Sequence, residues 1–342
     1  MDFGAITMTQ PTITALLRRP VCATLSIAPF LLAASGSALA EFRPLDDSRL
    51  SDVTGQAGVT IEMAAKVEVG QLRWQDEGSV DVNGIRLSGQ NNTMLDNMKL
   101  TLDVAGDGEV LNYGFSELAG QNISDPEAVN VLAGYAVNGS YGKQFNDGDL
   151  VMHLGAIDYG DPTNLTDFLH AVDFELAIDS IKNTGSQGSS TMFSDILLQG
   201  YLGPTDLVIR NDNSTRTLSN GDVVSGSELQ LESHFEITNG HLNWDKADLI
   251  LIFNLAAVSI DGLEIHNRRG NDTAGHLGMA SVKASLSNGT GGISGTDGLS
   301  VHDVEFRADV DMPVFRVGSN SIGGVYFTDF AITDTNMMVY GH

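Results

Sequence analysis

Histidine, hydroxyl and acidic side chains are the residues of this chain that could support catalysis or bind a metal. The eight histidines are His153, His170, His234, His241, His266, His276, His302 and His342. None forms a His-x-x-x-His pair, and Cys22 is the single cysteine, so a zinc site of common spacing is not expected. The Gly-x-Ser-x-Gly turn of serine hydrolases and a phosphate-binding glycine loop are also absent from the sequence. The sequence therefore predicts no catalytic residue and no enzyme activity.

Calcium is the cofactor that the sequence leaves open. Asp147 and Asp149 lie in an Asn-Asp-Gly-Asp turn, and Asp212 lies in an Asn-Asp-Asn turn. Carboxylate and amide oxygens in turns are the ligands that Ca²⁺ prefers, although neither turn has the spacing of an EF-hand. Carboxylates for glycoside cleavage could also come together on folding. Arg268 and Arg269, beside Asn271 and Asp272, are the nearest approach to a polysaccharide-cleaving cluster, and we expect them to lie in a loop.

The N-terminal segment has the three parts of a secretory signal peptide. Arg18 and Arg19 precede a short apolar run, and Ala38 to Ala40 form an A-x-A cleavage signal. We therefore expect residues 1–40 to be removed, leaving no cysteine and no transmembrane anchor. The net charge of −26 disfavours nucleic acid as a partner. The expected location is the periplasm, the outer surface or the medium.

Alternation of apolar and polar residues begins at Val59 and continues almost to the end of the chain. Residues 99–104, 173–178 and 228–231 are clear examples, and the 38 glycines punctuate such runs. The segment from Ser124 to Leu132 predicts one short helix, since it opens with a capping box that contains Pro126. One helical turn near Asn164 to His170 is a second candidate.

An eight-residue unit recurs, with apolar residues at positions one, three, six and eight. Its copies begin at Val80, Val258, Leu299 and Val325, and looser copies begin at Thr93 and Thr191. A continuing strand would place its next inward residue at position five, so each unit breaks the strand phase by one residue. The pattern predicts a strand, a corner and a second strand, with both arms facing one interior. The stretches 70–74 and 240–244, which hold both tryptophans, also raise the possibility of two related halves.

These patterns predict an all-β fold: an elongated sandwich, a groove or an irregular solenoid of strand-corner-strand units, with one short helix. We expect a polar lead-in over residues 41–58 and an elongated β domain over residues 59–342. Leu50, Val53, Gly55, Gln56 and Gly58 form the expected interaction segment. Residues 45–63 could add a strand to the sheet edge of a neighbouring molecule.

The run from Leu50 to Thr60 resembles the opening of an uncharacterised family of exported proteobacterial proteins, some of which are described as pilus-system proteins. The closing Tyr340, Gly341 and His342 are similar to the end of that family. The resemblance implies an exported surface or envelope protein and no catalytic residues.

The first expectation for function is a non-catalytic structural or interaction protein of the cell envelope or surface. It would be a filament subunit, a matrix protein or an adhesin, with itself or other envelope proteins as partners. The alternative is a periplasmic protein whose β-groove binds an apolar ligand or lipid. A carbohydrate-active β protein is the third possibility.

Overall fold

The structure is a computed structural model that describes residues 58–108, 145–161, 164–186, 188–245, 257–270 and 277–341. The expected signal peptide, nearly all of the expected lead-in and the helix expected from Ser124 lie outside these residues. The described residues all belong to one compact unit, Val53–His342. No helix in the described part of the chain is long and apolar enough to cross a membrane.

All described strands belong to one antiparallel sheet, in which the chain passes back and forth eight times. The first three passes are β1 (Val59–Ala65) with β2 (Val67–Gln75), β3 (Ser79–Ser88) with β4 (Leu95–Val104), and β5 (Leu150–Ala156) with β6 (Val172–Gly185). The other five are β7 (Gly188–Arg210), β9 (Val223–Trp244), the set β10 (Val258–Asp261), β11 (Glu264–His266) and β12 (Ala280–Thr290), then β13 (Asp297–Val317) and β14 (Asn320–Val339). Each pass pairs with the one before it, so the fold is a meander.

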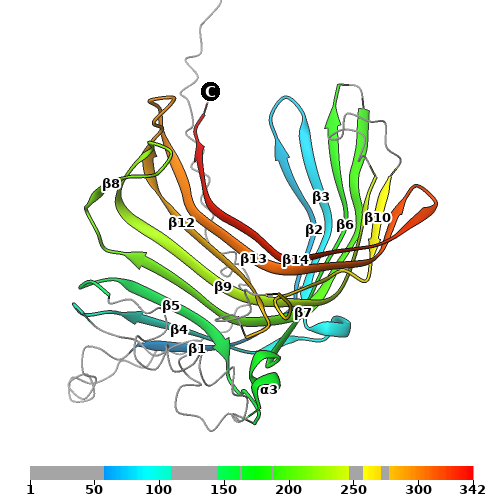
Figure 1. The fold of residues 1–342 in the computed structure, drawn as a ribbon, viewed down its shortest axis with the longest axis horizontal. Helices are drawn as coiled ribbons and strands as arrows, with labels where there is room; N and C mark the ends of the chain where they lie inside the picture. The colour runs from blue at the N-terminus through cyan, green and yellow to red at the C-terminus, as the bar shows by residue number, and fades with distance from the viewer. Residues whose placement is uncertain are drawn as a thin grey trace, which may run out of the picture. The chain divides into compact units, whose positions relative to one another are not determined.

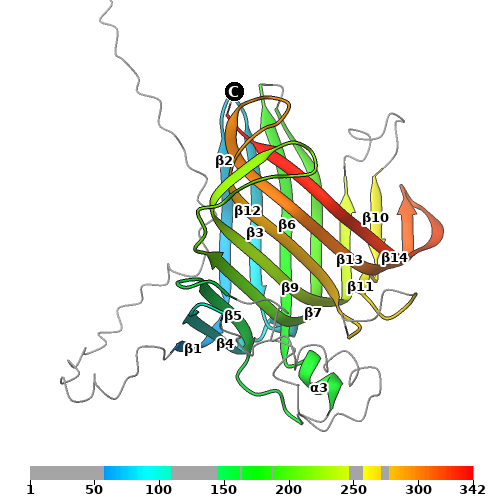
Figure 2. The same cartoon turned by 60° about the vertical axis from the view of Figure 1, so that its left-hand side comes forward.

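The sheet has two halves that meet at a junction. The first half holds β1, β4, β5 and β12, and the second holds β2, β3, β6, β10 and β11. The long strands β7, β9, β13 and β14 run through both halves and bend between them (Figure 1 and Figure 2). Several short elements connect or extend the strands: the 3-10 turn η1 (Gln90–Asn92), the helix α3 (Leu165–Leu169) and the strand β8 (Thr215–Thr217), which pairs with β9.

Cross-strand pairs give the sheet one apolar face and one polar face, because directly paired residues of antiparallel strands share a face. In the first half, Leu102 pairs with Met152, which pairs with Leu207, which pairs with Leu231. The same face continues through Leu286 to β13 and β14. At the junction it packs into a core around Leu95, Met98, Val172, Phe174 and Ile237. The alternation in the sequence therefore sorts residues between two faces of one sheet.

The predicted corners are confirmed at the fifth position of every repeat unit. Gly84, Asn97, Asp195, Gly262, Asp303 and Asp329 all have positive φ, between 51° and 72°. Glycine adopts this left-handed conformation freely, and Asn and Asp tolerate it better than other residues do. Pairing registers shift at Asn97, Asp195 and Asp303, as a β-bulge requires. The polar pair thus marks a left-handed corner in each unit. At Asn97, Asp195 and Asp303 the corner is a bulge, whereas pairing stays in register across Gly84 and Gly262.

Some of these positions line up across the second half of the sheet. Gly70 on β2 lies opposite Gly84 by register, and Gly84 lies against Asp179 of β6. Gly262 lies against Pro313 of β13, which is paired near Gly323 of β14. Because the breaks recur at one height on successive strands, the strands turn together and their pairing is preserved.

The all-β class and the helical turn after Asn164 are confirmed, whereas two finer expectations change. The described strands form one sheet instead of the two packed layers of a sandwich. The strands are also much longer than the short runs in the sequence suggest, since β7 has 23 residues and β9 has 22. A bulge shifts the alternation by one residue and makes one long strand read as two short ones.

We predict that Gly84→Ala destabilises the protein by about 1–2 kcal/mol, because a side chain at positive φ strains the backbone. The added Cβ would also lie 2.0 Å from Oδ2 of Asp179. The matched control is Asp195→Gly, which relieves the same conformation and loses a surface contact with His241 of 3.2 Å. Urea unfolding measures both variants, and equal losses would contradict the assignment of these positions as left-handed corners.

Candidate functional site

The polar face of the first half contains a pocket of about 580 Å³. Alternate residues of neighbouring strands line it, as the period of a β-strand requires. The charged and amide side chains around it are Asn146, Asp206, Arg210, Asp212, Arg216, Glu228, Gln230, Glu232, Lys283, Asp303 and Glu305. Acidic groups outnumber basic ones in this lining, so the pocket disfavours an anionic ligand.

The cations of the pocket are already paired with carboxylates of the same chain. Arg210 Nη1 lies 2.7 Å from Asp149, and Lys283 Nζ lies 3.2 Å from Glu232. Arg216 Nη2 lies 3.1 Å from Glu228 and 2.7 Å from Asp303. A ligand that binds these cations would have to displace the ion pairs. The lining therefore reads as a set of cross-strand ion pairs on a solvated sheet face.

Ser287, His302 and Asp303 follow the atomic order of a hydrolase triad but lack its other properties. Ser287 Oγ lies 3.0 Å from Nε2 of His302, whose Nδ1 lies 3.1 Å from Asp303 Oδ2. Arg216 Nη2, which can only donate, also lies 3.1 Å from Nδ1 and thus competes with Asp303 for the same ring nitrogen. In a hydrolase triad this nitrogen donates to the carboxylate alone, with no cation beside it.

Burial in this trio is also the reverse of what a triad needs. The His302 side chain is 0% exposed, whereas the carboxylate that would orient it is on a side chain 52% exposed. Burial opposes ionisation of Asp303, but its hydrogen bonds with Arg216 and His302 lower the pKa of Asp303 below its usual value. We therefore interpret the trio as part of a structural network that joins β12, β13 and, through Arg216, β8.

His153 and Asp206 form a buried pair across β5 and β7. Nδ1 of His153 lies 2.6 Å from Oδ1 of Asp206, and both side chains are almost fully buried. Burial, and secondly the charge of Lys99, lower the pKa of His153 from 6.5 to about 4. The imidazole is thus neutral at pH 7, with Nδ1–H donating to the carboxylate.

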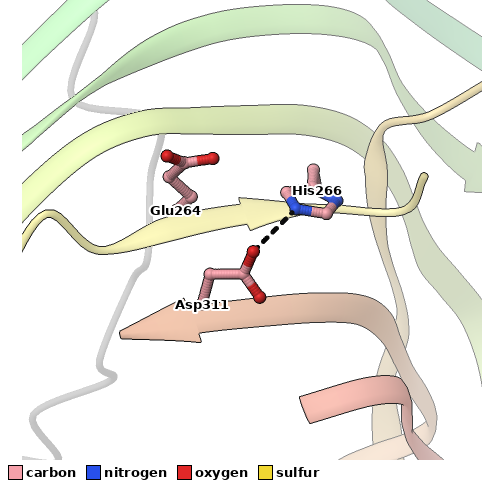
Figure 3. Close-up of side chains that lie close together, drawn as sticks. All are labelled: Glu264, His266 and Asp311. Carbon is pink, nitrogen blue, oxygen red and sulfur yellow. Dashed lines mark hydrogen bonds and ion pairs between the residues drawn. The ribbon is translucent and has the colours of Figure 1, made fainter. Parts of the chain in front are cut away.

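The described residues bring one possible set of metal ligands together, at the junction. Atoms of Glu264, His266 and Asp311 lie within 4.8 Å of one another (Figure 3). Arg269, however, donates to both oxygens of Asp311, and this contact is the main reason why the pKa of Asp311 is lowered. His266 Nδ1 also lies 3.3 Å from Asp309. A cation would have to displace Arg269, so the group is better described as an ion-pair network.

A second ion pair stabilises the junction near α3. Glu236, which is buried, pairs with Arg268 and accepts from His170 Nε2 at 2.9 Å. The imidazole of His170 stacks on Tyr201 with ring centroids 4.0 Å apart. Arg268 and Arg269, which the sequence assigns to a loop, thus anchor the segment after β11 to β9 and β13.

Two of the three carboxylates named in the calcium hypothesis, Asp149 and Asp212, accept hydrogen bonds from within the protein. Asp149 is fully buried and accepts from Arg210, from Asn146 N at 2.9 Å and from Asn211 N at 2.7 Å. Asp212 accepts from the hydroxyl and the backbone N–H of Ser214, which lower the pKa of its carboxyl. Asp147 lies in the same turn as Asp149. Calcium binding at these positions stays a prediction.

Most of the expected interaction segment lies outside the described residues. Leu50, Val53, Gly55 and Gln56 fall there, whereas Gly58 lies close against β4, where an added Cβ would be 2.8 Å from Leu102 O. Residues 59–63, expected as a strand donated to a neighbour, already pair with β4 of their own sheet. Among the described strands, none pairs with the other side of β1.

The two outermost passes of the sheet are the surfaces best suited to interaction. β14 pairs with β13 on one side, and no described strand pairs with its other side. None of its residues is buried, and its apolar side chains include Ile322, Tyr326 and Ile332 among the exposed ones. The opposite edge, β1 and β2, likewise exposes Ile61 and Leu72. Both edges therefore combine unpaired backbone with exposed apolar side chains.

The usual protections of an edge strand are sparse on β14. Residues 320–339 contain no lysine, arginine or proline, and their charged residues are Asp329 and Asp334 at two bulged positions. Natural edge strands are commonly shortened, charged or broken by proline to prevent pairing with other chains. β14 is instead 20 residues long. Such an edge is a template for strand addition.

Residues 21–106 match a family of unknown function (DUF6160). The match agrees with the resemblance to an uncharacterised family, and it spans the first two passes of the sheet, including the edge formed by β1 and β2. No curated protein matches the chain, and no solved structure does. The described strands define the class of this protein as a single-sheet β-meander, whose first and last passes each pair with a described strand on one side only.

We predict that stability falls as the pH drops from about 6.5 to about 4, with His153 contributing up to about 3 kcal/mol. The folded-state pKa of His153 is depressed, so the unfolded chain binds the extra proton in this window. His170, whose pKa burial also lowers, adds to the slope. Urea unfolding between pH 7 and pH 4 measures it. His153→Gln, whose amide still donates to Asp206, should show a shallower slope, and an unchanged slope would contradict the assignment.

Proposed function

We propose that this chain is an exported, non-catalytic structural protein of the cell envelope or surface, and that it acts by pairing at its sheet edges. The observation that carries the proposal is β14, a 20-residue strand with one open side and no buried residue. Main-chain hydrogen bonds along such an edge supply affinity, and alternate side chains supply specificity. The signal-like N-terminus and the resemblance to exported proteins support the location.

The polar pocket supports this reading over an enzyme. Its cations are paired with carboxylates of the same chain, and the histidine beside Ser287 is fully buried, with Arg216 competing for the nitrogen that faces Asp303. Carbohydrate-active chemistry would need carboxylates held apart for acid and base roles. Three pocket carboxylates, Glu228, Glu232 and Asp303, are instead in ion pairs with Arg216 or Lys283.

Binding of an apolar ligand is the second candidate, and the partly exposed apolar face favours it. Leu229, Leu231 and Ile209 lie on this face and are incompletely buried. The same side chains would be covered if a neighbouring molecule extended the sheet, so one experiment can separate the two functions.

The test is light scattering after size-exclusion chromatography of the full chain, recovered after export with its own N-terminus. We predict assemblies larger than a monomer, and a loss of at least tenfold in association strength for the pair Ile322→Lys and Ile332→Lys. Charges on an edge strand oppose pairing with another chain. Circular dichroism and the urea midpoint check that the variant is folded.

The matched control is Ile293→Lys, which changes the same residue type in the loop between β12 and β13, where the side chain is 99% exposed. It should assemble like the wild type. A wild-type monomer at all concentrations would contradict the proposal, and lipid in an organic extract of that monomer would favour the apolar-ligand function.

A further inference from the structure

We infer that the open edge formed by β1 and β2 in one molecule pairs with the open β14 edge of a second copy, so that the sheet continues from molecule to molecule. This inference rests on the proposed function and names the partner of the β14 edge as the opposite edge of the same protein. Four properties of the described residues support it: strand direction, edge length, face and charge.

Strand direction allows the sheet to continue without reversing. The described chain makes eight passes, and successive passes are antiparallel, so the first and last passes run in opposite directions. When a second copy is placed beside the first in the same orientation, its β1 and β2 therefore lie antiparallel to β14. An odd number of passes would have produced a parallel contact at this position.

The two edges also match in length and in the position of their bends. β1 and β2 together span residues 59–75 with one interruption at Lys66, and β14 spans residues 320–339. Both cross the junction, and both carry glycine in the row of bends, at Gly70 and at Gly323. Edges that turn at the same height can remain paired through the bend.

The apolar faces of the two edges lie on the same side of the sheet. This is because a second copy placed beside the first in the same orientation keeps its apolar face on that side. On β1, Ile61 pairs with Leu100 on the apolar face, and on β14, Ile332 pairs with Phe306 on that face. Pairing of the two edges would set apolar side chains of one copy beside those of the next. It would also cover groups now exposed, including Leu72 and Trp74 of β2.

Charge favours the unlike pair of edges over two copies of the same edge. The charged residues of β14 are Asp329 and Asp334, so two β14 strands brought together would oppose carboxylates near the junction. The other edge has Lys66 at the junction, 3.9 Å from Glu68, and Arg73 further along, which is paired with Asp81 of β3. Lys66 of one copy would therefore meet the region of Asp329 in the next.

An interface between two different edges is heterologous, and it leaves one edge of each kind open at the ends of every assembly. Such interfaces generate rings when the rotation closes and open fibres when it does not. The inference therefore predicts growth beyond a dimer, unlike a contact between two β14 strands, which would stop at two copies.

The experiment mixes two folded variants of the full chain. One carries Ile61→Lys and Leu72→Lys on the first edge, and the other carries Ile322→Lys and Ile332→Lys on β14. Alone, each variant should associate at least tenfold more weakly than the wild type, because every interface it can form contains one altered edge. Their equimolar mixture should form a one-to-one complex, joined by the two unaltered edges.

Other outcomes overturn the inference in distinguishable ways. If the first-edge variant still dimerises alone and the mixture forms no mixed complex, β14 pairs with itself, and the proposed function survives without this partner. If both variants associate as the wild type does, the edges are not the interface. If the wild type and Ile293→Lys are both monomers, self-association itself is contradicted, and the proposed function fails in this form.

Discussion

The backbone of a β-strand needs hydrogen-bond partners on both sides, and this need governs what the protein can do. A strand within the meander finds both partners in its own chain, but the first and last passes find only one. The described structure therefore has two rows of backbone groups that depend on solvent or on a partner. The β14 row has none of the proline, shortness or strong charge that usually blocks pairing. We regard these edges as the source of the protein's function.

The bulges and the ion pairs both stabilise the bend between the two halves of the sheet. Positive-φ residues at the corners let strands of 20 or more residues bend together without losing their neighbours. At the junction, where β11 ends and α3 is inserted, the chain leaves the ladder and polar groups need other partners. Glu236, Arg268, Arg269 and Asp311 provide them. These charged residues resemble a binding site when each cluster is considered alone, but their ion pairs stabilise the bend.

The sequence allowed the local structure to be predicted better than the surfaces. A phase break after a polar pair is a local property, and it located bulges at Asn97, Asp195 and Asp303 correctly. The same break concealed the length of the strands, because one long strand with a bulge has the apolar–polar pattern of two short strands. Pairings such as Arg210 with Asp149, 61 residues apart, depend on which strands become neighbours. The identity of the edge strands depends on the order of strands in the sheet, which alternation within a strand does not encode.

Hydrogen–deuterium exchange of the backbone amides of β14 tests the central claim most directly, with the full chain measured across a range of concentrations. The account predicts that outward amides of residues 320–339 exchange quickly in dilute protein and become protected as it associates, with parallel protection over residues 59–75. Amides of the interior strand β9 should keep the same protection throughout. Assembly that leaves the exchange of both edges unchanged would contradict the account.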